Sequence, residues 1–165
     1  MIKGAKICGI SDLKTLEYIL NHPHPPKFVG FVCNYKKSKR NVPFKILNEL
    51  LKINKQNINF VSVLVNPENE ILEKLKDLNF DYYQLYDVDP NRTLHIKNKY
   101  QKKIISAFTV EKAEDVEKYL FYKNIADIFL FDGKGYEKSI SFDHNFLNKI
   151  PEDIPKMIAG NIQIN

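Results

Sequence analysis

Short apolar runs that recur along the whole chain constrain its fold more than any other sequence feature. Most are four to seven residues long, continuous rather than alternating, and rich in β-branched or aromatic residues. They are Ala5–Ile10, Phe28–Cys33, Phe60–Val65, Tyr82–Leu85, Ile104–Phe108, Ile125–Phe131 and Met157–Ala159. Such runs are typical of strands that are buried on both faces of a parallel sheet.

Apolar residues with helical spacing lie between these runs. They fall in the ranges 13–20, 44–51, 71–78, 92–100, 116–120 and 146–150. Pro43 suits a first helical turn, and Asn66 is predicted to cap the third helix, with Pro67 and Glu68 in its opening turn. Seven strands alternating with helices indicate a parallel α/β protein. Both an open doubly wound sheet and a (β/α)₈ TIM barrel fit this order; seven units favour the barrel, although a complete barrel needs eight.

Length and composition fit a single globular domain that spans residues 1–165. The chain is 44% hydrophobic and 27% charged, which is ordinary for a protein with a packed core. It has neither an apolar run of the ~20 residues that cross a bilayer nor a signal-peptide pattern, so we expect a cytoplasmic protein with no membrane partner. The net charge of +5 comes from scattered lysines rather than a basic stripe with interleaved aromatics, so we expect no nucleic-acid partner.

Polar residues at the carboxyl ends of the predicted strands form a candidate site, because functional side chains of barrels gather there. Cys8 ends the first run and Asp132 follows the sixth, so a thiol and a carboxylate could face each other as base and acid. Arg40, after the second run, suits a carboxylate or phosphate through its bidentate fork. Taken alone, Cys8 could equally be a small buried hydrophobe and Asp132 a helix N-cap.

Other reactive side chains give weaker signals. Two cysteines form neither a metal nor a disulfide framework, and Cys33 is expected in the core. His22 and His24 lie in a proline-rich turn without a third ligand, so no metal site is expected. Tyr82, Tyr83 and Tyr86 are expected to serve packing.

Several segments, taken in order along the whole chain, match the pattern of one enzyme family. The most specific is the opening Lys6–Ile10, followed by Ser11 and Asp12. Phe129–Asp132 matches a sixth strand that ends in an acid. The other matching segments are Gly30–Val32 with Lys37–Arg40, Phe60–Asn66, Asp81–Leu85 and Ile158–Gly160. Together they resemble phosphoribosylanthranilate isomerase, an enzyme family of tryptophan biosynthesis.

The resemblance implies a (β/α)₈ barrel that performs an Amadori rearrangement without a cofactor. The substrate would be N-(5-phosphoribosyl)anthranilate and the product 1-(2-carboxyphenylamino)-1-deoxyribulose 5-phosphate. Asp132 would act as the general acid that opens the ribose ring, and Cys8, as thiolate, would remove the proton from C2. The implied substrate-binding residues are Arg40 for the anthranilate carboxylate, Gln84 as a polar wall residue, Gly135, Gly160 and Asn161.

The chain also departs from the family pattern. Tyr86 stands where the family usually has histidine, and Gly160-Asn161 replaces a Gly-Gly pair. The loop 133–143 keeps only Phe142-Asp143 and one or two glycines of the family loop. No eighth strand with a Ser-Ser-Gly phosphate loop is present, so only seven units of the barrel are expected.

The incomplete barrel leaves alternatives open. The chain could be a truncated product of a longer reading frame, which Ile162–Asn165 favours because it resembles the start of a further helical turn. It could instead be a natural short form whose open edge is covered by a partner or by a second copy in a homo-oligomer. Two other functions also fit: a non-catalytic barrel that binds a phosphorylated ligand or a partner chain, and another phosphosugar isomerase, which would not need Arg40.

Overall fold

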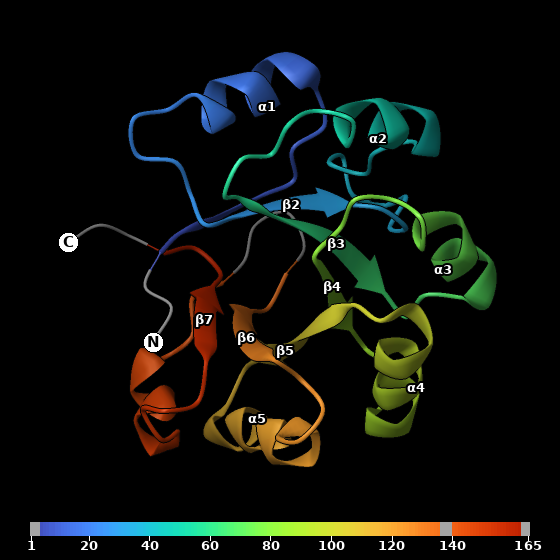
Figure 1. The fold of residues 1–165 in the computed structure, drawn as a ribbon. Helices are drawn as coiled ribbons and strands as arrows, with labels where there is room; N and C mark the ends of the chain where they lie inside the picture. Colours follow the sequence, from blue (N-terminus) through green and yellow to red (C-terminus); the bar gives the residue numbers. More distant parts are fainter. Residues whose placement is uncertain (1–3, 136–139, 163–165) are drawn as a thin grey trace.

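The structure is a computed structural model that describes residues 4–135 and 140–162. Its described residues form one parallel sheet in which each strand pairs with the next along the chain, in the order β1 to β7 (Figure 1). The strands are β1 (Lys6–Cys8), β2 (Phe28–Val32), β3 (Asn59–Val65), β4 (Tyr82–Tyr86), β5 (Lys103–Val110), β6 (Ile128–Gly133) and β7 (Lys156–Ala159). The prediction of an incomplete barrel with seven strands is confirmed, and within these ranges β1 and β7 are the edges of the sheet.

Helices follow the strands and cover the outer face of the curved sheet (Figure 1). They are α1 (Leu13–Leu20), α2 (Phe44–Leu50), α3 (Asn69–Leu75), α4 (Pro90–Tyr100), α5 (Ala113–Glu117) and the 3₁₀ helices η1 (Lys118–Tyr122) and η2 (His144–Lys149). Within the described ranges, no helix is both long and apolar enough to traverse a bilayer. The predicted helical turn at Ile162–Asn165 falls mostly outside the described residues.

The prediction for the start of α3 was wrong. Asn66 adopts a left-handed conformation with φ of 38°, and its amide donates to the carbonyl of Tyr86 at 2.9 Å, so it still hydrogen-bonds to β4 directly after β3 ends. Two further residues therefore precede the helix, and Glu68 is the N-cap. Pro43 is likewise the N-cap of α2 rather than a residue of its first turn.

The continuous apolar runs are explained by burial on both faces of the sheet. Phe60 and Leu64 of β3 pack outward beneath the helices, whereas Val61 and Val63 point into the barrel interior. Phe60, Val61 and Leu64 are completely buried, and Val63 is 6% exposed. A strand that buries both faces has no position at which a polar residue is favoured, so polar and apolar residues do not alternate along its sequence.

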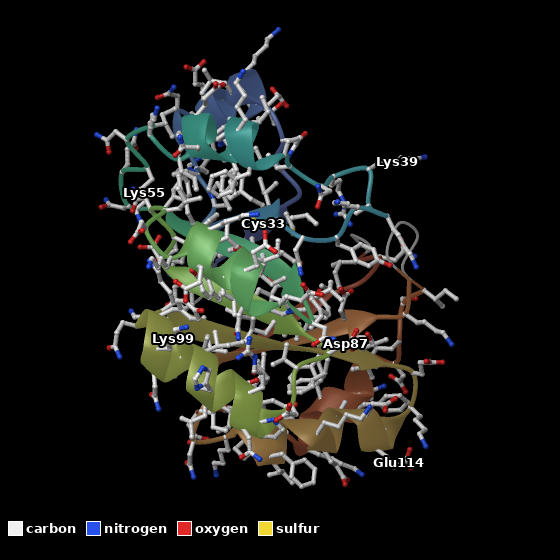
Figure 2. The ribbon with its side chains drawn as sticks, turned by 90° about the vertical axis from the view of Figure 1, so that its right-hand side faces the viewer. Cys33, Lys39, Lys55, Asp87, Lys99 and Glu114 are labelled. Atoms are coloured by element: carbon white, nitrogen blue, oxygen red, sulfur yellow. The ribbon has the colours of Figure 1, made fainter. Side chains whose placement is uncertain are left out.

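Two aspartates fix the beginnings of strands at the amino-terminal end of the sheet. Asp81 accepts the amide of Phe60 at 2.7 Å and the ammonium of Lys55 at 2.7 Å. Asp127 repeats the arrangement with the amide of Ile104 at 2.7 Å and Lys97 at 3.0 Å. Figure 2 shows this end of the sheet at Lys55 and the opposite end, where the strands finish, at Asp87.

Candidate active site

The carboxyl ends of the strands surround a cavity of about 1010 Å³. Residues from all seven described strands and from the loops after β2, β5, β6 and β7 form its walls. All the residues predicted for the site line it: Cys8, Arg40, Gln84, Asp132, Gly135, Gly160 and Asn161. The parallel topology thus brings together residues that lie up to 153 positions apart in the sequence, from Cys8 to Asn161.

Cys8 is the last residue of β1 and pairs with Gly30 on β2. A Cβ atom on Gly30 would lie 3.0 Å from both the Sγ of Cys8 and the Nζ of Lys6. The missing side chain therefore leaves room for the thiol and for the ammonium of Lys6, both of which line the cavity. Lys6 is a cation of the site that the sequence reasoning did not single out.

Gly9 explains why the opening motif has glycine after cysteine. Its φ is +92°, a conformation that other residues rarely adopt, and a Cβ atom there would collide with the aliphatic chain of Arg40. Arg40 therefore lies across the end of β1, and it contributes to the cavity wall. Its backbone amide donates to the hydroxyl of Ser38 at 3.1 Å, which holds the loop after β2 in place.

Asp132 on β6 is partly buried, and its Oδ2 accepts a hydrogen bond of 2.8 Å from the hydroxyl of Tyr86. Burial raises the pKa of the Asp132 carboxyl, while the Tyr86 hydroxyl and the positive charges of Lys6 and Arg40 oppose that rise. A carboxyl with a raised pKa is more readily protonated near neutral pH, as a general acid requires. Asp132 lies within β6, which continues to Gly133, so it is not the N-cap of any described helix.

Tyr86 is a second residue of the site, besides Lys6, whose role the sequence reasoning missed. It was expected to serve packing, yet its hydroxyl reaches the carboxylate of Asp132. Burial, followed by the negative charge of Asp132, raises the pKa of Tyr86 well above its usual value. The phenol therefore stays protonated and remains a donor. The sequence held one sign that position 86 is special: tyrosine stands here where the family usually has histidine.

Gln84 and Gly160 complete the walls next to these groups. Gln84 is 1% exposed, and its Oε1 has no hydrogen-bond partner within the described part of the chain. A buried acceptor of this kind favours a ligand that brings a donor. Gly160 has φ of +93°, and a Cβ atom there would collide with the amide of Gly133 and approach Oδ1 of Asp132 to 3.0 Å.

The remaining predictions fall away from the cavity. Burial raises the pKa of the Cys33 thiol to about 12, and the thiol donates to the carbonyl of Phe31 at 3.2 Å, which agrees with a core residue. The amide of His24 donates to Nδ1 of His22 within their turn. Among residues 4–135 and 140–162, no three histidine, cysteine, aspartate or glutamate side chains gather as a metal site would require. Residues 136–139 of the predicted loop lie outside the described residues.

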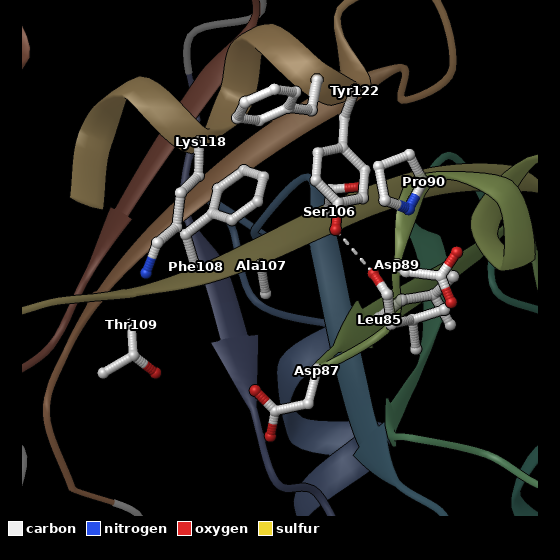
Figure 3. A pocket seen from close by; sticks show the side chains of 12 residues that line it. Leu85, Asp87, Asp89, Pro90, Ser106, Ala107, Phe108, Thr109, Lys118 and Tyr122 are labelled. Atoms are coloured by element: carbon white, nitrogen blue, oxygen red, sulfur yellow. Dashed lines mark hydrogen bonds between the residues drawn. The ribbon is translucent and has the colours of Figure 1, made fainter. Parts of the chain in front are cut away.

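A second cavity of about 450 Å³ lies on the outer side of β4 and β5, beneath η1 (Figure 3). Asp87, Ser106 and Tyr122 are among its lining residues, and the hydroxyl of Tyr122 donates to the carbonyl of Val88 at 2.7 Å. Thr109 lines both cavities. None of the residues predicted for the site lies in the second cavity.

Comparison with known proteins identifies the family. The family model described as N-(5'-phosphoribosyl)anthranilate (PRA) isomerase matches residues 5–165. The chain belongs to this family. The N-(5'-phosphoribosyl)anthranilate isomerase of Agrobacterium fabrum is 31% identical over 166 aligned positions, which cover 95% of the chain and 74% of that protein. The enzyme of the same name from Brucella canis is 30% identical, and the alignment covers 98% of the chain and 76% of that protein.

Solved structures of the same family have the same fold. The phosphoribosyl anthranilate isomerase of Thermotoga maritima superimposes with a TM-score of 0.79 at 24% identity, over 95% of the chain and 76% of its own length. A phosphoribosyl anthranilate isomerase in complex with reduced 1-(o-carboxyphenylamino)-1-deoxyribulose 5-phosphate gives a TM-score of 0.76 at 23% identity, over 95% and 75%. The chain thus spans about three quarters of the length of its relatives.

Proposed function

We propose that this member of the phosphoribosylanthranilate isomerase family is an enzyme that catalyses the Amadori rearrangement of N-(5-phosphoribosyl)anthranilate. The product is 1-(2-carboxyphenylamino)-1-deoxyribulose 5-phosphate, an intermediate of tryptophan biosynthesis, and the reaction takes place in the cytoplasm without a cofactor. The observation that carries the proposal is the presence of Cys8 and Asp132 in the wall of one cavity at the carboxyl ends of the strands. Residues 1–165 act as one domain in this proposal.

The first step is ring opening, assisted by Asp132. The protonated carboxyl gives its proton to the ring oxygen of the ribose while the bond from that oxygen to C1 breaks. The lone pair of the anthranilate nitrogen forms the new double bond to C1, which yields a protonated Schiff base and an aspartate anion. A carboxyl whose burial favours the protonated form is suited to this step.

The second step is removal of the proton from C2, assisted by Cys8. The cationic Schiff base makes that proton acidic, and the thiolate accepts it. The electron pair of the C2–H bond forms the C1–C2 double bond, and the nitrogen recovers its lone pair. The resulting enolamine returns to the ketone by protonation at C1 and loss of the proton from the oxygen on C2, so the reaction is an isomerisation without net oxidation.

Binding in this proposal is shared among the residues around the two reacting groups. Arg40 binds the anthranilate carboxylate through its guanidinium, because a planar fork matches a carboxylate. Gln84 is a polar wall residue, and Gly135, Gly160 and Asn161 contribute loops that close around the substrate. The cavity volume of about 1010 Å³ leaves ample room for a phosphoribosyl group and an aromatic ring.

The proposal is tested by incubating the purified protein with N-(5-phosphoribosyl)anthranilate and separating substrate from product by chromatography. The expected result is conversion, together with growth of a tryptophan auxotroph that lacks this isomerase when it expresses the chain. A folded protein that gives neither result would favour the non-catalytic barrel that binds a phosphorylated ligand or a partner chain.

We also propose that a second copy of the chain covers the open edge of the sheet. Ile7 on β1 and Ile158 on β7 are 41% and 45% exposed, and both strands are edges within the described ranges. Exposed apolar edge strands favour pairing with another chain. Sedimentation analysis is expected to give a dimer that dissociates in the Ile158→Lys variant, whereas a monomer at all concentrations would overturn this point.

A further inference from the structure

The hydrogen bond between Tyr86 and Asp132 joins two strands that are not neighbours. Tyr86 lies on β4 and Asp132 on β6, with β5 between them. In the register of the sheet, Tyr86 pairs with Ala107 of β5, and Asp132 pairs with Thr109, two residues further along β5. The phenol therefore reaches across β5 on the inner face of the barrel to bring its hydroxyl within 2.8 Å of Oδ2.

Ala107 is the residue over which the ring has to pass. It belongs to the inner apolar cluster, in which Tyr86 also packs, and it is 7% exposed. Ile105, the preceding inward-facing residue of β5, is much larger. A small residue at position 107 thus leaves the space that a phenol needs to cross from β4 to β6.

We propose that Tyr86 is a positioning residue for Asp132: its hydroxyl holds Oδ2 and leaves Oδ1 as the oxygen that delivers the proton. The inference rests on the proposed function, in which Asp132 is the acid. Oδ1 lies toward Gly160, where a Cβ atom would come within 3.0 Å of it. The absence of a side chain at Gly160 keeps this oxygen open to the cavity.

The hydroxyl of Tyr86 also sets how strong an acid Asp132 is. A donor to a carboxylate favours the ionised form and opposes the effect of burial on the pKa of Asp132. Removing the hydroxyl is therefore expected to raise that pKa further. Within residues 4–135 and 140–162, the other titratable or charged side chains that line the same cavity are Lys6, Cys8, Tyr35, Arg40, Glu111 and Lys134.

Tyr86→Phe tests the inference, with Tyr82→Phe as the matched control. Tyr82 lies on the same strand and the same inner face and packs edge-to-face on Phe28, far from the carboxylate. In Tyr86→Phe we expect kcat to fall about 10- to 100-fold with KM little changed, because the acid is no longer held in place. The high-pH limb of the rate profile is expected to move to higher pH, because Asp132 stays protonated longer. Tyr82→Phe should change neither.

A second readout does not depend on turnover. In protein labelled with ¹³C at aspartate carboxyls, the Asp132 signal is assigned as the one lost in Asp132→Asn, and its titration is followed. We expect the titration to move to higher pH in Tyr86→Phe and to stay in place in Tyr82→Phe. If Tyr86→Phe does not fold, Ala107→Val, which crowds the ring away from β6, is expected to give the same shift.

The outcomes separate the two proposals. An unmoved Asp132 titration in Tyr86→Phe, or a loss of activity equal to that of Tyr82→Phe, would overturn the positioning role. A complete loss of turnover equal to that of Asp132→Asn would also overturn it, because Tyr86 would then be an essential acid itself. Absence of turnover in the unchanged protein would overturn the proposed function, and the titration would still decide whether Tyr86 holds Asp132.

Discussion

Two hydrogen bonds join Asp81 and Phe60 where β4 and β3 begin. The amide of Asp81 donates to the carbonyl of Phe60 at 2.9 Å, and the amide of Phe60 donates to the Asp81 carboxylate at 2.7 Å. Asp127 and Ile104 form the same reciprocal pair between β6 and β5. Both pairs lie at the end of the sheet opposite the cavity, so they serve the register of the strands rather than chemistry.

Asp127→Ala is therefore expected to lower stability without affecting catalysis. The change leaves the amide of the fully buried Ile104 without its carboxylate and removes the ion pair with Lys97. We expect the free energy of unfolding, measured by urea titration, to fall by about 1 to 3 kcal/mol. The exposed Asp77 offers the control Asp77→Ala, which should change stability little. Equal losses in the two variants would contradict the assignment.

Cys8→Ser is expected to lower kcat by about 10²- to 10⁴-fold, because a hydroxyl is a far weaker base than a thiolate. Circular dichroism should show an unchanged fold, since serine fits the space above Gly30. Cys33→Ser is the matched control, as it keeps a donor for the Phe31 carbonyl outside the cavity. Normal turnover by Cys8→Ser would rule out its role as base.

The two thiols are also expected to differ in reactivity. Cys8 lines the open cavity, whereas burial raises the pKa of Cys33 to about 12. At pH 8 only on the order of one Cys33 thiol in ten thousand is then ionised, and only the thiolate attacks iodoacetamide. Mass spectrometry of partly alkylated protein should find the label at Cys8 first. Substrate should slow that labelling.

Asp132→Asn is expected to abolish turnover and, at neutral pH, to stabilise the fold. Burial raises the pKa of Asp132, so the native state holds this proton more tightly than the unfolded chain does. The ionised carboxylate therefore costs stability, and the cost appears as pH rises through the native pKa. Urea titrations over a pH series that begins below 3.8 should show a gain for Asp132→Asn that grows as the pH rises through the native pKa and then levels off. A gain confined to low pH would contradict the sign.

Arg40→Ala is expected to raise KM about 10- to 100-fold with a smaller effect on kcat, because a charge-assisted bond to the substrate carboxylate is lost. Arg40→Lys should recover only part of the affinity, since an ammonium lacks the planar fork. Unchanged kinetics in Arg40→Ala would point instead to another phosphosugar isomerase, whose substrate carries no anthranilate carboxylate.

Much of this architecture could be read from the sequence because burial on both faces leaves continuous apolar runs. The predicted ends of the strands then placed Cys8 and Asp132 at the same, carboxyl-terminal end of the sheet. The prediction at Asn66 was wrong because asparagine suits two positions. It can cap the start of a helix, but it can also adopt a left-handed conformation at the end of a strand, as it does here. The hydrogen bond from Tyr86 to Asp132 could not be predicted, because it depends on the ring of Tyr86 crossing β5 above the small side chain of Ala107.

The strand order has a consequence for biosynthesis. Because every strand pairs with its immediate predecessor in the chain, the sheet can be extended unit by unit while the polypeptide leaves the ribosome, without waiting for distant segments. The thiol is made among the first ten residues, and the carboxylate arrives only with the sixth strand. The nascent protein therefore carries five of the seven described strands before the strand that holds Asp132 is made.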